Sequence, residues 1–131
     1  MDIAKTYSVA NVRVEKDRGN YWLEIYLMLL DNSEHRKFQV GGFAVETPDR
    51  QNRYLITGPT GETSIIKYVG GSEKYKYARF TMPIGEMEYD LIQKKAIVRF
   101  MVEDLSEKVN HRHSESFLIV NGKPQEIDRT F

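Results

Sequence analysis

Short runs rich in Val, Ile, Tyr and Phe recur along the chain, with turn-forming residues between them. Runs of this composition and spacing are typical of antiparallel sandwiches and barrels. We therefore predict an all-β fold, an antiparallel β-sandwich of immunoglobulin-like or jelly-roll-like type with about 8–9 strands. The predicted strands are Thr6–Val14, Tyr21–Leu30, Lys37–Val45, Tyr54–Thr57, Thr63–Val69, Tyr75–Met82, Ala96–Glu103 and Ser114–Val120.

The strongest turn signal is Asn121-Gly122. A two-residue type I′ turn needs positive φ at both positions, and Asn-Gly tolerates this best. The pair predicts a C-terminal hairpin whose second strand covers Gln125–Phe131. Pro124 near the start of that strand places it at a sheet edge, because proline cannot donate a ladder hydrogen bond.

Residues 1–131 are expected to form a single domain, with residues 121–131 as a C-terminal hairpin or edge strand. No repeat or low-complexity linker divides the chain. Only Pro83–Lys95 lacks strand character, and Met87 and Leu91 lie four residues apart in it, so we interpret it as a loop with a short helix. The expected core includes Trp22 or Leu23, Ile25, Leu27, Ile97 or Val98, Phe100, Phe117 and Ile119.

Charge and composition remove several classes of partner. The 19 basic and 19 acidic residues cancel, so nothing points to nucleic acid or an anionic membrane. The chain has no cysteine, which excludes disulfides and thiolate metal sites. Met1–Thr6 lacks the features of a signal peptide, and the apolar run Tyr21–Leu30 is too short for a membrane helix. We expect a protein made in the cytoplasm.

The segment Tyr54–Ser64 resembles the start of a nucleotide-binding P-loop, because glycines follow a strand-like run. A P-loop needs Lys after its last glycine and then a helix whose N-terminus faces the phosphate. Here Glu62 would repel a phosphate, and Ser64-Ile65-Ile66 favours a strand. We interpret the segment as a hairpin turn.

His111, His113 and Glu115 alternate, so on a strand their side chains would project from one face. Two imidazoles and a carboxylate can form a facial metal site. The polar neighbours Asn110 and Ser114 are equally typical of a solvated hairpin, and nothing in the sequence supplies the outer hydrogen bonds that fix metal ligands. We expect no metal and no cofactor.

The remaining carboxylates have no diagnostic spacing for catalysis or calcium binding. No Gly-x-Ser-x-Gly elbow of a serine hydrolase occurs either. We therefore predict that the chain is not an enzyme. The carboxylates considered are Glu86 with Glu88, and Glu103, Asp104 and Glu107.

Tyr68, Tyr75 and Tyr77 precede Arg79 and Phe80 and form an aromatic and basic stripe. Such stripes stack on bases or sugar rings and anchor protein interfaces. Tyrosine is also simply favoured in strands. We take Tyr68, Tyr75 and Tyr77 as candidate partner contacts.

From Phe38 to Val120 the order of features resembles the immunoglobulin-like N-terminal domain of phage tail baseplate upper proteins. The resemblance implies a structural virion component that assembles with copies of itself and with other baseplate parts, and it brings no catalytic residue. Lys94-Lys95 departs from the family pattern, which usually has a glycine there. The matching pieces are Phe43–Asp49, Phe80–Pro83, Ala96–Val102 and Ser116–Val120.

The leading functional hypothesis is a non-catalytic structural or adaptor module that binds other proteins as a homo-oligomer or hetero-assembly. One alternative is a small stand-alone protein that binds and inhibits a partner, of immunity or anti-defence type. Others are a carbohydrate-binding module that uses the tyrosines and a metal-dependent enzyme that uses His111 and His113. The neighbouring genes would separate the first two.

Overall fold

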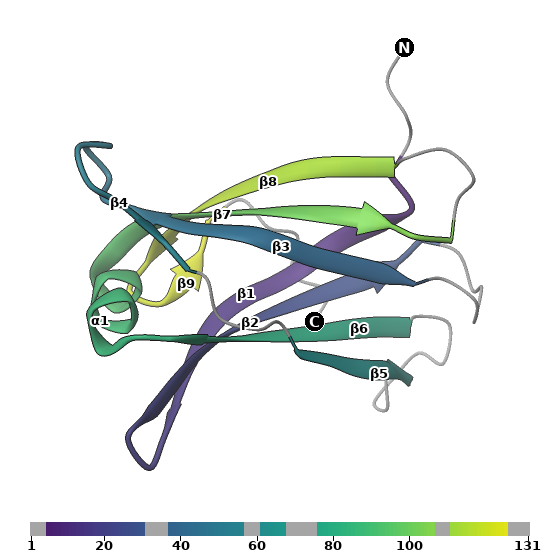
Figure 1. Ribbon diagram of the computed structural model, residues 1–131, viewed down its shortest axis with the longest axis horizontal. Coiled ribbons are helices and arrows are strands. Elements are labelled where there is room, and N and C mark those ends of the chain that lie inside the picture. The colour runs from purple at the N-terminus through teal and green to yellow at the C-terminus, as the bar shows by residue number, and fades with distance from the viewer. Residues whose placement is uncertain (1–4, 31–36, 57–60, 68–75, 107–110, 126–131) are drawn as a thin grey trace.

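The computed structural model describes residues 5–30, 37–56, 61–67, 76–106 and 111–125 (Figure 1). Strands dominate these ranges, as predicted. The elements in chain order are β1 (Tyr7–Asp17), β2 (Asn20–Leu29), β3 (Phe38–Glu46), β4 (Arg53–Leu55), β5 (Gly61–Lys67), β6 (Lys76–Ile84), α1 (Glu86–Lys94), β7 (Lys95–Asp104), β8 (His111–Val120) and β9 (Lys123–Pro124).

The strands form two antiparallel sheets that face each other. Sheet A has the order β1-β2-β6-β5, and sheet B has the order β4-β3-β7-β8-β9. In the immunoglobulin fold, strands A-B-E-D face strands C-F-G. The first eight strands here follow that arrangement, with β4 as an additional strand beside the third. The predicted antiparallel β-sandwich is confirmed.

The core lies between the sheets and follows the alternation of side chains along each strand. Leu23, rather than Trp22, and Val98, rather than Ile97, are fully buried. Phe117 is partly buried and packs against the core. Phe43, Phe100 and Phe117 form a row of stacked rings with centroids 5.9–6.0 Å apart. The predicted core residues Ile25, Leu27, Phe100 and Ile119 are also buried.

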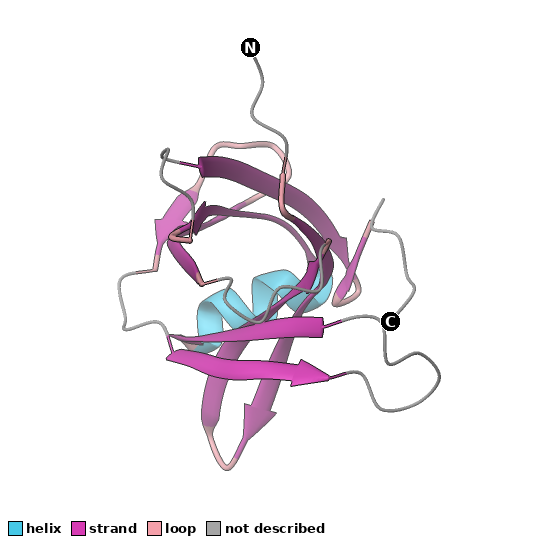
Figure 2. Cartoon of the chain, turned by 90° about the vertical axis from the view of Figure 1, so that its right-hand side faces the viewer, coloured by secondary structure: helices cyan, strands magenta, loops and turns pink. Residues whose placement is uncertain are grey.

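Helix α1 closes one end of the sandwich and contacts strands of both sheets (Figure 2). Ile92 anchors it in the core, and the Tyr89 ring lies 4.9 Å from that of Tyr21. The predicted short helix is therefore present, but Met87 of the pair that indicated it is 51% exposed. Among the described residues no helix has the length and apolar character needed to span a membrane.

The predicted C-terminal hairpin is confirmed at its turn. Asn121 and Gly122 have φ of 52° and 75°, and Val120 pairs with Lys123. The strand β9 lies at the edge of sheet B, where Pro124 can be accommodated. It ends at Pro124 rather than beginning at Gln125, and residues 126–131 lie outside the described residues.

The interpretation of Gly58–Gly61 as a hairpin turn is wrong. Strand β4 before it belongs to sheet B and strand β5 after it belongs to sheet A, so the chain crosses between sheets here. Turn residues favour both kinds of connection, which is why composition did not separate them. A strand starts at Gly61, as Ser64-Ile65-Ile66 indicated, so the helix that a P-loop requires is not there.

Candidate functional site

The outer face of sheet A carries a set of aromatic and charged side chains at its centre. Along β2, Leu23 and Ile25 point into the core, so Trp22, Glu24 and Tyr26 lie on the opposite face. Glu24 is only 2% exposed although the core residues of β2 lie on the other face of the sheet. Its neighbours must therefore shield it.

Strand register brings those neighbours to Glu24. Arg13 of β1 lies directly across from Glu24 on one side, and Thr81 of β6 lies across on the other. Arg79 is two residues from Thr81 and pairs with Tyr26, so it shares the same face. Three neighbouring strands thus contribute to one cluster.

The Glu24 carboxylate accepts four hydrogen bonds. Oε1 accepts from Trp22 Nε1 at 3.0 Å and from Arg79 Nη2 at 3.1 Å. Oε2 accepts from Arg13 Nε at 3.0 Å and from the Tyr26 hydroxyl at 2.7 Å. We call this cluster of Arg13, Trp22, Glu24, Tyr26 and Arg79 the Glu24 platform.

The pKa values of the platform reflect its electrostatics. Burial opposes ionisation of Glu24, but hydrogen bonds from Trp22, Tyr26 and Arg13 outweigh it and lower the pKa of the carboxyl. Burial and the bond to Glu24 raise the pKa of the Tyr26 hydroxyl. Burial also opposes the charge of Arg13, yet Glu24 raises the pKa of its guanidinium. The platform is an ionised, hydrogen-bonded unit at neutral pH.

The shared carboxylate holds side chains that would otherwise move freely. The Arg13 guanidinium lies 5.7 Å from the Tyr26 ring centroid, within cation–π range, and Arg13 also pairs with Glu15 at 2.9 Å. The Arg13 and Arg79 side chains are still 44% and 32% exposed. The platform therefore presents fixed polar and aromatic groups to its surroundings.

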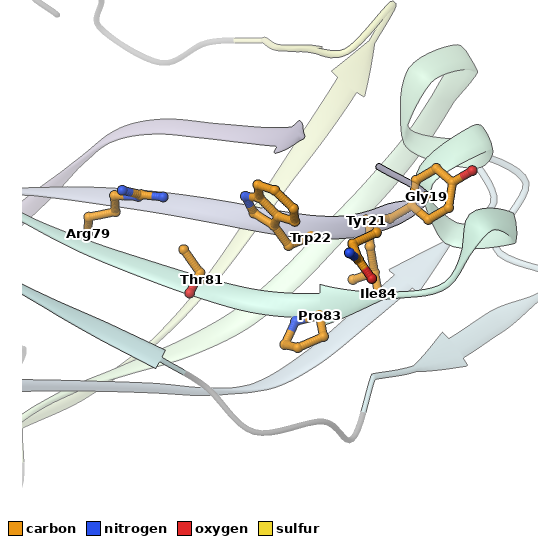
Figure 3. A pocket seen from close by; sticks show the side chains of 8 residues that line it. Gly19, Tyr21, Trp22, Arg79, Thr81, Pro83 and Ile84 are labelled. Atoms are coloured by element: carbon orange, nitrogen blue, oxygen red, sulfur yellow. The ribbon is translucent and has the colours of Figure 1, made fainter. Parts of the chain in front are cut away.

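An open cavity of about 570 Å³ adjoins the platform (Figure 3). It lies at the end of sheet A where the turn joins β1 to β2. It extends along β2 and β6, and its lining includes Trp22, Arg79, Thr81 and Pro83. Arg79 is the one charged side chain among the described residues of this lining. Its Nε is buried and has no hydrogen-bond partner in the described part of the chain.

The structure describes one of the three tyrosines that were predicted to contact a partner. Tyr68 and Tyr75 lie outside the described residues. Tyr77 is 4% exposed and Phe80 is 2% exposed, with Phe80 in the core. Burial leaves Tyr77 little surface for a direct contact, so among the described residues of this stripe Arg79 is the one that joins the site.

His113 and Glu115 lie in β8, not in a solvated turn as their polar neighbours suggested. Glu115 is buried and accepts a short hydrogen bond from the Tyr7 hydroxyl and an ion pair at 2.9 Å from Lys5. Burial and this bond raise the pKa of Tyr7. His113 packs edge-on to Tyr7, and its Nε2 has no partner among the described residues. The side chain of His111 is outside the description.

The other predicted carboxylates have structural partners. Glu103 binds Arg112 at 2.7 Å, and the buried Asp104 accepts from the Thr6 hydroxyl at 2.6 Å. Glu86 and Glu88 lie in the first turn of α1, where acidic side chains stabilise the helix dipole. No group of three potential metal ligands occurs within the described ranges, and Glu107 falls outside them.

No family model matches the chain, and no curated protein matches it in sequence. The site therefore rests on geometry alone. The sequence analysis treated Tyr21–Leu30 only as an apolar run and missed the platform. The alternation of Trp22, Glu24 and Tyr26 against Leu23, Ile25 and Leu27 was the available signal.

Proposed function

We propose that this chain is a non-catalytic module that binds another protein, as part of a larger assembly, through the Glu24 platform and its cavity. The observation that carries the proposal is a tryptophan, a tyrosine and two arginines fixed by one buried carboxylate on an open sheet face. Trp, Tyr and Arg are the residues most enriched among binding hot spots.

The rigidity of the platform favours binding. Ordering a long side chain at an interface costs about 0.5–1.5 kcal/mol, and groups already held in place avoid much of that cost. Arg13 and Arg79 are held by Glu24 before any partner arrives. The Arg79 side chain is 32% exposed although its Nε is buried, so its guanidinium keeps surface for a partner.

The same geometry favours binding over catalysis. A general base needs a free lone pair that can reach a substrate proton. Each oxygen of Glu24 already accepts two hydrogen bonds, and the lowered pKa of the carboxyl makes it a weak base. Glu24 therefore acts as the support of the platform.

Two biological settings fit such a module. The resemblance to the immunoglobulin-like domain of phage baseplate upper proteins supports a structural part of a virion. An inhibitor of immunity or anti-defence type would use the same surface to block one partner. Tail genes on either side of the gene would favour the first setting, and an adjacent toxin or nuclease gene would favour the second.

A carbohydrate-binding module is a second candidate, and the cavity is the observation that favours it. The partly exposed Trp22 ring lies beside Arg79 and Thr81, an arrangement in which a sugar ring can stack and its hydroxyls can accept hydrogen bonds from Arg79. Titration with soluble oligosaccharides, followed by tryptophan fluorescence, tests this candidate directly. A saturable shift that Thr81→Ala weakens would favour sugar over protein, because Thr81 lines the cavity and this variant keeps the single tryptophan.

The test of protein binding uses photo-crosslinking in cells that co-express the products of neighbouring genes. A photo-reactive residue at Tyr26 should crosslink to a partner in stoichiometric yield. The matched control is the same residue at Leu118, which is 37% exposed on the outer face of sheet B. Arg79→Gln should reduce the yield at position 26 at least tenfold, whereas Arg112→Gln on sheet B should not.

Equal crosslinking from positions 26 and 118 would refute the proposal, because it would mean that the platform has no special part in binding. So would an unchanged yield in a correctly folded Arg79→Gln variant. Thermal unfolding followed by far-UV circular dichroism establishes that each variant is folded.

A further inference from the structure

A second surface of the molecule, on α1, is apolar and acidic, whereas the platform presents arginines. Met87 and Leu91 form an apolar row on α1, and Glu86 and Asp90 form an acidic row beside it. These residues border a hollow of about 430 Å³ together with Lys94. We call Glu86, Met87, Asp90 and Leu91 the α1 ridge.

The α1 ridge is available for contact. Met87 is 51% exposed, whereas Leu91 is partly buried against the core and Ile92 is fully buried in it. An exposed methionine in a row with a second apolar residue, flanked by acids, is the pattern of a helix that lies in a hydrophobic groove of a partner.

The ridge and the platform cavity are complementary in charge and in chemistry. The cavity offers the Trp22 ring and Pro83 as apolar surface and the guanidinium of Arg79 as its one charge among the described lining residues. Arg13 also pairs with Glu15, whereas Glu24 is the one acidic partner of Arg79 among the described residues. A carboxylate on an apolar helix surface satisfies both requirements.

The two surfaces also adjoin each other in the fold. Ile84 lines the cavity, Glu86 begins α1, and only Gly85 separates them. Figure 1 shows β6 leading directly into α1. When two different surfaces lie side by side, a two-fold axis between two copies can place each against its complement in the other copy.

Resting on the proposed function, we infer that the partner at the platform is α1 of a second copy of this chain, in a symmetric dimer. Met87 and Leu91 of one copy pack on Trp22 of the other, and the acidic row faces Arg79. The contact occurs twice. The 19 basic and 19 acidic residues leave no net charge to hold two copies apart.

Light scattering across a concentration series tests whether the dimer exists. The wild-type chain should be dimeric, and added salt should weaken it because the contact pairs opposite charges. Trp22→Ala and Asp90→Arg should each raise the dimer dissociation constant at least tenfold. Arg112→Gln, on the outer face of sheet B, should leave it unchanged. Thermal unfolding confirms that each variant is folded.

Disulfide trapping tests whether these two surfaces meet, and the absence of native cysteine makes it clean. One chain carries Thr81→Cys in the cavity and a differently tagged chain carries Met87→Cys on the ridge. Mild oxidation should join the two tags, because a disulfide needs Cα atoms within about 7 Å. Leu118→Cys in place of Thr81→Cys should give little product.

A monomeric wild-type chain, a dimer indifferent to Trp22→Ala and Asp90→Arg, or equal trapping from positions 81 and 118 would each overturn the inference. None of these outcomes by itself contradicts the proposed function. If position 26 still crosslinks to a co-expressed protein while the chain is monomeric, the platform binds a different protein. If both experiments fail, the proposed function fails as well.

Discussion

The outer faces of the two sheets carry the same ionic arrangement with different surroundings. On sheet A, Glu24 is 2% exposed and binds Arg13 and Arg79. On sheet B, Glu46 is 8% exposed, with Arg99 Nε at 2.9 Å and Arg53 Nε at 3.7 Å. Each glutamate is thus flanked by arginines from the strands on both sides of it.

The two faces differ in the aromatic side chains around the glutamate. Glu24 also accepts from Trp22 and Tyr26, and a cavity adjoins it. An ion pair across neighbouring strands is a common way to cover a sheet face and contributes little when exposed. The arrangement on sheet B shows that such pairs do not by themselves mark a binding site. The indole and the cavity on sheet A are what suggest one.

The largest expected effect comes from removing the charge of each glutamate in turn. Glu24→Gln should lower the free energy of unfolding by about 3 kcal/mol, because four donors then converge on an amide whose own NH₂ group also donates. Glu46→Gln should cost about 1 kcal/mol, because among the described residues Glu46 is held by two arginines and by no tryptophan or tyrosine donor. Urea denaturation followed by circular dichroism measures both. Equal losses would mean that the two faces do not differ in this way.

Acid should erase the contribution of Glu24. Its pKa in the folded state lies below the ordinary value of 4.5, so the unfolded state takes up a proton first as the pH falls. The stabilisation is complete above that ordinary value and disappears as the pH falls through the folded pKa. The stability difference between wild type and Glu24→Gln should therefore be constant from about pH 7 to pH 5 and shrink below about pH 4.

Urea midpoints for the two proteins at several pH values measure this difference. A gap that is unchanged at low pH would show that the Glu24→Gln loss comes from packing and not from charge. The urea slope should stay the same for both proteins, so that the comparison reports stability alone.

Much of the fold was predictable because strand periodicity and turn chemistry are local. The runs that contain Leu23 and Val98 were recognised as strands. Asn121-Gly122 was recognised as the turn of the C-terminal hairpin. The connection at Gly58–Gly61 was misjudged because turn residues do not encode which sheet receives the next strand. That choice depends on contacts between distant parts of the chain.

The site was less predictable for the same reason. Trp22, Glu24 and Tyr26 share a face by alternation, which the sequence contains. The arrival of Arg13 and Arg79 on that face depends on the register of β1 and β6 against β2, which the sequence does not reveal. The tyrosine stripe attracted attention because it is contiguous, yet Tyr77 within it is buried.

The smallest effect on stability should come from the indole, although it has the largest part in the proposed contact. Trp22→Phe removes one donor of Glu24 and keeps an aromatic ring, and the carboxylate retains the other three donors. We expect a loss of about 0.5 kcal/mol in the free energy of unfolding, measured by urea denaturation. Dimer formation should weaken by a larger factor than this loss implies, because the smaller ring covers less of the α1 ridge. If stability falls as far as in Glu24→Gln while association is unchanged, Trp22 is a structural residue and sheet A resembles sheet B after all.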